Sequence, residues 1–222
     1  MPKKAERIPL NLRLLREESL LSRPVLAGEL GLSIAILVAL ETGQGSPRIA
    51  TLYQLSLVLA RHLEKRAAEV FDALIPEEAY TRVEPIYQVA SAHLANKSMQ
   101  AGNLKAKRQF AKRQETLVYD EPPPESVNFS RAQKLYARSR YSKVELVDIA
   151  QISLPRLSTL FGQSAERTGN MTLGVFLRLT AALAPVYGKG IKETAFYLLE
   201  VDLEQLDALY QERAEKNPNR SA

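Results

Sequence analysis

Serine, proline and glycine residues divide residues 12–59 into helix-sized blocks, and this punctuation constrains the fold more than any other feature of the sequence. Ser22 followed by Pro24 predicts a helix start, because serine accepts a hydrogen bond from an unpaired amide and proline lacks the N–H that would stay unpaired there. Gly31 predicts the end of that helix, where the chain turns into the left-handed region. Ser33 predicts a second helix start. The sequence therefore predicts two short helices on either side of a tight glycine joint.

Further helices are predicted over residues 12–18 and 49–63 on either side of this pair, and the second short helix is predicted to end at residues 41–43. An amphipathic stretch over 64–75, stopped by Pro76, predicts a fifth helix. The order of residues in this region resembles the lambda-repressor-like (Xre-type) DNA-binding family. The matching residues are Leu12, Arg13, Arg16, Glu17, Glu18, Leu21, Ser22, Leu26, Ala27, Leu30, Gly31, Leu32, Ser33, Leu37, Glu41, Gly43, Pro47, Leu52, Leu55 and Leu59. The resemblance implies a helix-turn-helix domain whose third helix, the recognition helix, enters the major groove of DNA.

The composition narrows the classes of function. The chain is 222 residues long, which suggests one or two domains, each with a core of its own. It has no cysteine and only two histidines, so disulfide scaffolds, thiolate zinc sites and His-rich sites are excluded or nearly so. It also has no phosphate-binding glycine loop and no cluster of acids with a histidine. We therefore expect a protein that is not an enzyme and needs no cofactor and no metal.

The pattern of the first domain returns after a proline-rich spacer, where Ser142 stands 120 residues after Ser22. At this offset the coinciding apolar pairs are Leu15 and Leu135, Leu26 and Leu146, Ala27 and Val147, Leu32 and Ile152, and Leu37 and Leu157. At an offset of 124, Leu173, Phe176, Leu179 and Leu183 coincide with Ile49, Leu52, Leu55 and Leu59. We interpret this as a second, divergent copy of the domain, in which a glutamate and a glycine become Phe161 and Gln151. A helical packing that only resembles a repeat is the alternative.

Between the copies, residues 97–113 carry six lysines and arginines and no acid. Two interpretations are open: a solvated linker, or an arm that neutralises DNA phosphates. The basic residues named for the arm are Lys107, Arg108, Lys112 and Arg113. A proline-rich stretch over 121–126 predicts a stiff spacer. The predicted fold is all-α, with a first helix-turn-helix domain over 1–76, a helical, basic, proline-containing connector over 77–128, and a second helix-turn-helix domain with a C-terminal helix over 129–222.

The composition of each recognition helix determines which copy can recognise bases. Base edges carry hydrogen-bond donors and acceptors, so their recognition needs polar side chains. In the second copy the candidate residues are Ser153, Arg156, Ser158 and Thr159, with Leu157 turned toward the core. Arg156 can pair with a guanine through two hydrogen bonds. The second copy therefore carries an adequate base-contacting helix.

The recognition helix of the first copy is apolar over residues 34–40 and cannot recognise bases in this way. Leu37 and Leu40 are predicted to face the core. The residues predicted to face outward are Ile34, Ile36 and Val38. An exposed apolar patch marks an interaction site or needs a cover. Three explanations are open: a cover from this chain such as residues 77–95, an interface with a protein partner, or an apolar helix inserted into a DNA groove.

Phosphate contacts are predicted at the amino end of the second helix and at the joint before the fourth helix of each copy. In the first copy these residues are Ser22, Arg23, Gln44 and Arg48. In the second copy they are Ser142, Lys143 and Arg167. Such contacts fix the register of a protein on DNA and add affinity, but they carry no sequence information.

The sequence therefore favours a sequence-preferring DNA-binding protein that regulates transcription, with double-stranded DNA as its partner. A net charge of +5 agrees with a polyanionic partner. The alternative is an interaction adaptor built from degenerate helix-turn-helix domains. By the family resemblance we expect a homodimer, held partly by a helix over 192–216. No apolar run reaches membrane-spanning length and no signal-peptide apolar region is present, so a cytoplasmic protein without a membrane partner is expected.

Overall fold

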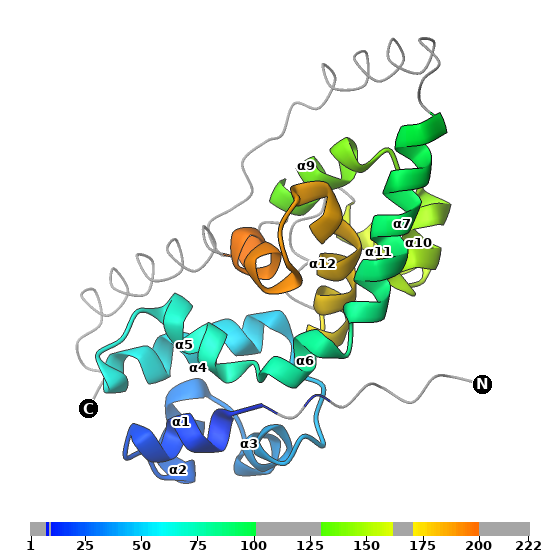
Figure 1. Cartoon of the computed structure of the whole chain (residues 1–222). Helices are drawn as coiled ribbons and strands as arrows, with labels where there is room; N and C mark the ends of the chain where they lie inside the picture. The colour runs from blue at the N-terminus through cyan, green and yellow to red at the C-terminus, as the bar shows by residue number, and fades with distance from the viewer. Residues whose placement is uncertain (1–7, 9, 101–129, 162–170, 200–222) are drawn as a thin grey trace. The chain divides into compact units, whose positions relative to one another are not determined.

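The structure is a computed structural model that describes residues 8, 10–100, 130–161 and 171–199. Every regular element in these ranges is an α-helix, so the expected all-α class is confirmed (Figure 1). The chain divides into two compact units. The first comprises residues 1–81, 169–176 and 199–222, and the second comprises residues 82–168 and 177–198. Each unit is described by itself below.

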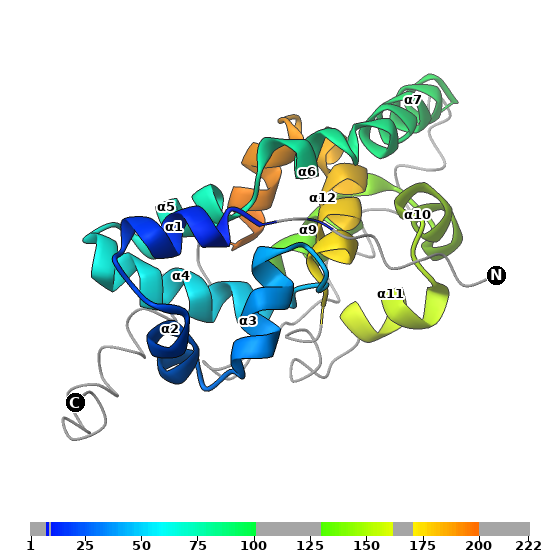
Figure 2. The ribbon, with the colours of Figure 1, turned by 90° about the horizontal axis from the view of Figure 1, so that it is seen from below.

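The first unit holds the helices predicted from the punctuation of the sequence. They are α1 (Leu12–Glu18), α2 (Arg23–Leu30), α3 (Ile34–Glu41), α4 (Ile49–Leu63), α5 (Ala67–Leu74) and α6 (Glu77–Thr81). The predicted bounds of α1 and α4 agree with the structure. Figure 2 shows α1, α2 and α3 gathered at α4, and α5 packs along α4 as well.

The core of the first unit forms around α4 because this helix is the longest of the six and buries the most residues. Its residues Leu52, Leu55 and Leu59 have no exposed surface. The Tyr53 ring of α4 lies 5.6 Å from the Phe71 ring of α5, measured between centroids. The apolar residues that join them in the core include Leu12, Leu15, Leu26, Leu37, Leu40, Val70 and Leu74. Burial of a leucine or phenylalanine side chain contributes about 1.5–3 kcal/mol, so this set accounts for the closure of the unit.

The second unit contains α7 (Glu84–Gln100), α9 (Ser130–Ser139), α10 (Lys143–Ala150), α11 (Leu154–Leu160), most of α12 (Leu173–Tyr187) and the helical residues 191–198. Its core contains Leu135, Leu146, Leu157, Leu179, Leu183 and Leu198. Helix α7 packs against α10 in this unit. The buried Tyr141, just before α10, donates a hydrogen bond of 3.2 Å from its hydroxyl to the Ala90 carbonyl of α7.

The connector predicted over 77–128 is divided between the units where the structure describes it. Residues 77–81, which form α6, group with the first unit, and residues from Arg82 onward group with the second. Helix α7 contributes to the core of the second unit, since Ala90 is fully buried there. The proline-rich spacer and the basic residues beyond Gln100 lie outside the described residues.

A short antiparallel bridge joins Arg48 to Thr172 inside the first unit. Two backbone hydrogen bonds flank it: the Ile49 amide donates to the Met171 carbonyl at 2.8 Å, and the Leu173 amide donates to the Pro47 carbonyl at 2.9 Å. The apolar residues on both segments are buried.

Among the described residues no single helix has the length and apolar character needed to cross a membrane; α2 and α3 meet that criterion only when they are counted together across their bend.

Candidate nucleic-acid interface

Helices α2 and α3 of the first unit meet at a short, capped joint. The Ser22 hydroxyl accepts a hydrogen bond from the Val25 amide at 3.4 Å, and the Ser33 hydroxyl accepts one from the Ile36 amide at 3.3 Å. Between these two caps Gly31 adopts a left-handed conformation with φ of 63°. The two helices bend by 109° across the joint. This value lies inside the range of about 90–120° that is typical of the helix-turn-helix motif.

Helix α3 presents apolar side chains outward, as its sequence predicts. Leu37 and Leu40 are buried, whereas Ile34 and Ile36 are each 48% exposed. Val38 is half-buried. In the described part of the first unit Ile34 and Ile36 stay exposed, and α3 carries no charged residue before Glu41. This helix therefore lacks the donors and acceptors that base recognition needs.

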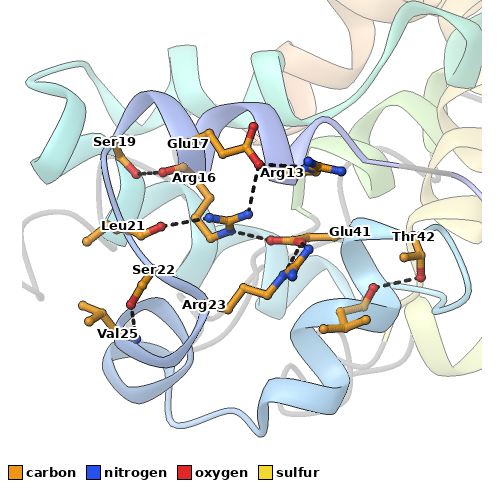
Figure 3. A network of polar contacts seen from close by, with 11 residues as sticks. Arg13, Arg16, Glu17, Ser19, Leu21, Ser22, Arg23, Val25, Glu41 and Thr42 are labelled. Atoms are coloured by element: carbon orange, nitrogen blue, oxygen red, sulfur yellow. Dashed lines mark hydrogen bonds and ion pairs between the residues drawn. The ribbon is translucent and has the colours of Figure 1, made fainter.

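A buried ion-pair network holds α1, α2 and α3 together (Figure 3). The Glu41 side chain at the end of α3 is only 1% exposed. Its carboxylate accepts a hydrogen bond of 2.6 Å from Arg16 Nε of α1 and one of 2.8 Å from Arg23 Nε of α2. Arg16 also donates to the Leu21 carbonyl at 2.9 Å. A buried carboxylate is costly unless it is paired, and here two guanidinium groups pair it.

The network changes the role expected for Arg23. Its side chain is 41% exposed, but its Nε and one terminal nitrogen face Glu41. The amino end of α2 carries no acid in its first turn, so no carboxylate there repels an anion. Ser22 and Arg23 thus remain together at the start of α2, with Arg23 held in place by Glu41.

An aromatic pair replaces this network in the second unit. Tyr136 stands 120 residues after Arg16, and Phe161 stands 120 residues after Glu41. Their rings stack with centroids 5.0 Å apart and an interplanar angle of 13°. The residues changed from an ion pair to a stacked pair, and the contact between the two positions is retained.

Backbone features recur at the same offset. The Ser19 hydroxyl donates to the Arg16 carbonyl at 2.8 Å, and the Ser139 hydroxyl donates to the Tyr136 carbonyl at 2.6 Å. Non-glycine residues with positive φ are uncommon. In the described part of the chain there are four, Leu20, Glu64, Arg140 and Gln151. Leu20 corresponds to Arg140, and Gly31 to Gln151, at an offset of 120 residues. Glu64 corresponds to Gly188 at an offset of 124, and all six residues have a positive φ. The backbone therefore follows the same course through both stretches.

Helix α11 lies where the recognition helix of the second copy is expected, and it exposes the polar Ser158 together with the apolar Leu154 and Pro155. Leu157 has no exposed surface, as predicted, while Ser153 and Ser158 are exposed and Arg156 is half-buried. Ser153 stands at the N-cap position of α11, but its hydroxyl makes no capping hydrogen bond there. That hydroxyl is not committed to the cap. Thr159 is helical, and its side chain lies outside the described residues.

The amino end of α10 differs from that of α2 because an acid occupies it. Ser142 and Glu145 form a reciprocal capping box: the Glu145 amide donates to Ser142 Oγ at 3.2 Å, and the Ser142 amide donates to the Glu145 carboxylate at 2.6 Å. A carboxylate at this position repels a phosphate. The predicted phosphate contacts of Ser142 and Lys143 are therefore weaker candidates than those of Ser22 and Arg23.

Two residues of α7 reach the same carboxylate, which sequence reasoning missed. Lys97 Nζ lies 2.7 Å from one Glu145 oxygen, and His93 Nε2 lies 3.1 Å from the other. Burial alone raises the pKa of Glu145, but the hydrogen bonds from Lys97 and Ser142 outweigh it and lower the pKa to about 2. The spacing of Ser142 and Glu145 is a capping-box signal readable in sequence. Their contact with α7 spans about fifty residues and leaves no local signal.

Other predicted residues are partly placed. Gln44 and Arg48 are both exposed at the joint before α4. The remaining residues lie outside the described part of the chain: Lys107, Arg108, Lys112, Arg113 and Arg167. Within the described ranges no group of three or more histidines, aspartates or glutamates is placed to hold a metal ion.

No protein-family model matches the chain, and searches of curated proteins and of solved structures give no match.

Proposed function

We propose that the chain is a sequence-preferring DNA-binding protein that regulates transcription in the cytoplasm, built of two lambda-repressor-like helix-turn-helix domains. The observation that carries the proposal is the pair of short helices with a serine at each N-cap position and a left-handed joint, found at α2–α3 and again at α10–α11. The bend of 109° at the first joint supports it. A domain of this type places its third helix in the major groove.

The two copies have different roles in this proposal: one recognises bases and the other contacts phosphates. Helix α11 recognises bases, because Ser153, Arg156 and Ser158 offer the polar groups that base edges require. The first copy contributes phosphate contacts through the amino end of α2, which carries no acid, and through Arg48. Sequence preference then depends on the second copy, and affinity depends on both.

The basic residues between the copies add to affinity. Lys107, Arg108, Lys112 and Arg113 neutralise phosphates without regard to sequence in this proposal. Each phosphate contact contributes about 0.9 to the slope of log affinity against log salt concentration on duplex DNA. A second chain joins through the helix expected over 192–216, as proposed from the family resemblance.

A protein-binding adaptor is the second candidate, and one observation favours it. Ile34 and Ile36 are each 48% exposed on a helix that has no polar residue on its outer face. An apolar patch of this kind is typical of a protein interface. In this alternative α3 binds a protein partner, and the positive net charge of the chain has no part in DNA binding.

Binding to random duplex DNA over a range of salt concentrations separates the two candidates. A DNA-binding protein loses affinity steeply as salt rises, because released counterions drive its binding. An adaptor shows no steep slope and no binding at moderate salt. A flat response with the full chain would reject the DNA-binding proposal and favour the adaptor.

A further inference from the structure

The bridge between Arg48 and Thr172 joins two positions that are equivalent in the internal repeat. Thr172 stands 124 residues after Arg48, which is the offset that relates α12 to α4. The same offset relates Met171 to Pro47 and Leu173 to Ile49. Each segment is therefore paired with its own counterpart.

The two hydrogen bonds of the bridge are equivalent under the internal repeat. The Ile49 amide donates to the Met171 carbonyl at 2.8 Å, and the Leu173 amide donates to the Pro47 carbonyl at 2.9 Å. Replacing each residue by its equivalent turns the first bond into the second. This reciprocity is the local signature of an isologous contact, in which the same patch meets itself.

Burial follows the same reciprocal pattern. Pro47 and Ile49 are buried on one segment, and Met171 and Leu173 are buried on the other. The central residues face outward, with Arg48 exposed and Thr172 half-buried. Both segments therefore bury the same alternate positions, as two paired strands do.

We infer that the segment before the fourth helix is a self-complementary pairing edge, and that this chain fills it in cis with the equivalent segment of its other copy. The partner that fits the edge is residues 171–173 of the same molecule, not a second chain. Any homodimer must then use another surface, such as the helix expected over 192–216. The inference rests on the internal repeat and on the two hydrogen bonds, and it does not depend on DNA binding.

A disulfide across the bridge tests the inference directly, because the chain has no cysteine of its own. Arg48 and Thr172 form the type of antiparallel pair that is flanked by hydrogen bonds without making them, and such pairs have Cα atoms about 4.5 Å apart. This separation is within the range of a disulfide, about 4.4–6.8 Å. The variant carries Arg48→Cys and Thr172→Cys in the full chain, oxidised mildly and examined by non-reducing denaturing electrophoresis and thiol titration.

The inference predicts nearly complete loss of free thiol in a covalently monomeric chain. A disulfide between two chains would overturn it, since the edge would then pair in trans. Persistent free thiols in a folded variant would also overturn it. The matched control combines Gln44→Cys with Thr172→Cys: Gln44 is exposed on the same joint but is not opposite Thr172, so this pair is expected to stay reduced.

Hydrogen exchange in the unaltered protein gives a second test that needs no variant to fold. Ile49 and Leu173 are the first residues of α4 and α12, and the first amides of a helix have no partner inside the helix. The bridge supplies the hydrogen bond that each of these amides makes. We expect the Ile49 amide to exchange about tenfold more slowly than that of Ala50 in the same first turn, the protection that one backbone hydrogen bond provides, and the Leu173 amide to be protected to the same degree. Equal rates for Ile49, Leu173 and Ala50 would overturn the inference.

Discussion

Exchanging the ion pair of the first unit for the aromatic pair of the second tests whether the two cores are built on one plan. The perturbation is a cycle of three variants of the full chain: Arg16→Tyr, Glu41→Phe and the double variant. Arg16 and Glu41 occupy the positions that Tyr136 and Phe161 occupy 120 residues later. The double variant therefore places the aromatic pair of the second unit at the equivalent positions of the first unit.

The burial of the two charges sets the size of the effect. The Arg16 side chain is 9% exposed and that of Glu41 is 1% exposed. Glu41→Phe leaves the buried Arg16 without this carboxylate, and losing one partner of a buried pair costs about 3–5 kcal/mol. Arg16→Tyr should cost less than this, because Glu41 keeps its pairing with Arg23. In the double variant both buried charges are gone, and a stacked pair adds about 0.5–1.5 kcal/mol beyond its area. Arg23 also loses Glu41, but its side chain is 41% exposed, so its loss is at most about 1 kcal/mol.

Urea denaturation followed by circular dichroism measures the three free energies of unfolding. We expect the double variant to lie within about 2 kcal/mol of the unaltered protein, although each single variant is worse. Arg13→Tyr is the matched control, since the Arg13 side chain is 65% exposed and its change should leave the free energy of unfolding nearly unaltered. A double variant as unstable as the sum of the two single variants would refute the reasoning, because the positions would then not be interchangeable.

Three further predictions concern charge and exposure. The lowered pKa of Glu145, about 2, means that its ionised form stabilises the fold at neutral pH and that this contribution falls away as pH drops from about 4.5 toward 2. The free energy of unfolding of Glu145→Gln, measured as a function of pH, should therefore lack this decline at acid pH. A pH profile identical to that of the unaltered protein would contradict the prediction. Ile36→Asp should leave the melting temperature nearly unchanged, because Ile36 is 48% exposed. If α3 is a protein interface, the same variant should no longer bind the protein partner. A large loss of stability would show instead that Ile36 is covered. Neutralising Lys107, Arg108, Lys112 and Arg113 together should weaken binding to every duplex and flatten the salt slope by about 0.9 per lost contact, and an unaltered slope would exclude the arm.

Local features of the fold were predictable because their causes lie within a few residues. Ser22, Gly31 and Ser33 fix two helix starts and one helix end through bonds that span three residues or through a single backbone angle. Sequence spacing reports such causes directly. The inward turn of Leu37 and Leu157 was predictable for the same reason, since helical periodicity sets which side of a helix is buried.

Long-range contacts were not predictable in this way. The sequence marks Glu41 and Arg16 only as residues of the family resemblance, because their pairing across 25 positions has no local signal. Gln151 differs from Gly31 in residue type, yet it adopts the same left-handed turn with φ of 52°. The surrounding packing therefore imposes the turn on a residue that does not favour it. The contacts that α7 makes with Glu145, about fifty residues away in the sequence, have no local signal either.

Selection of bound duplexes from a random pool, at one fixed salt concentration, is the most direct test of the central proposal. The unaltered chain should enrich a defined sequence. Arg156→Ala should lose about 1–3 kcal/mol of discrimination at a guanine position while its salt slope stays intact. Lys189→Ala, which removes an exposed cation just beyond α12, is the matched control and should keep the preference. An unaltered chain that enriches no sequence, or Arg156→Ala with full preference, would contradict the assignment of base recognition to α11.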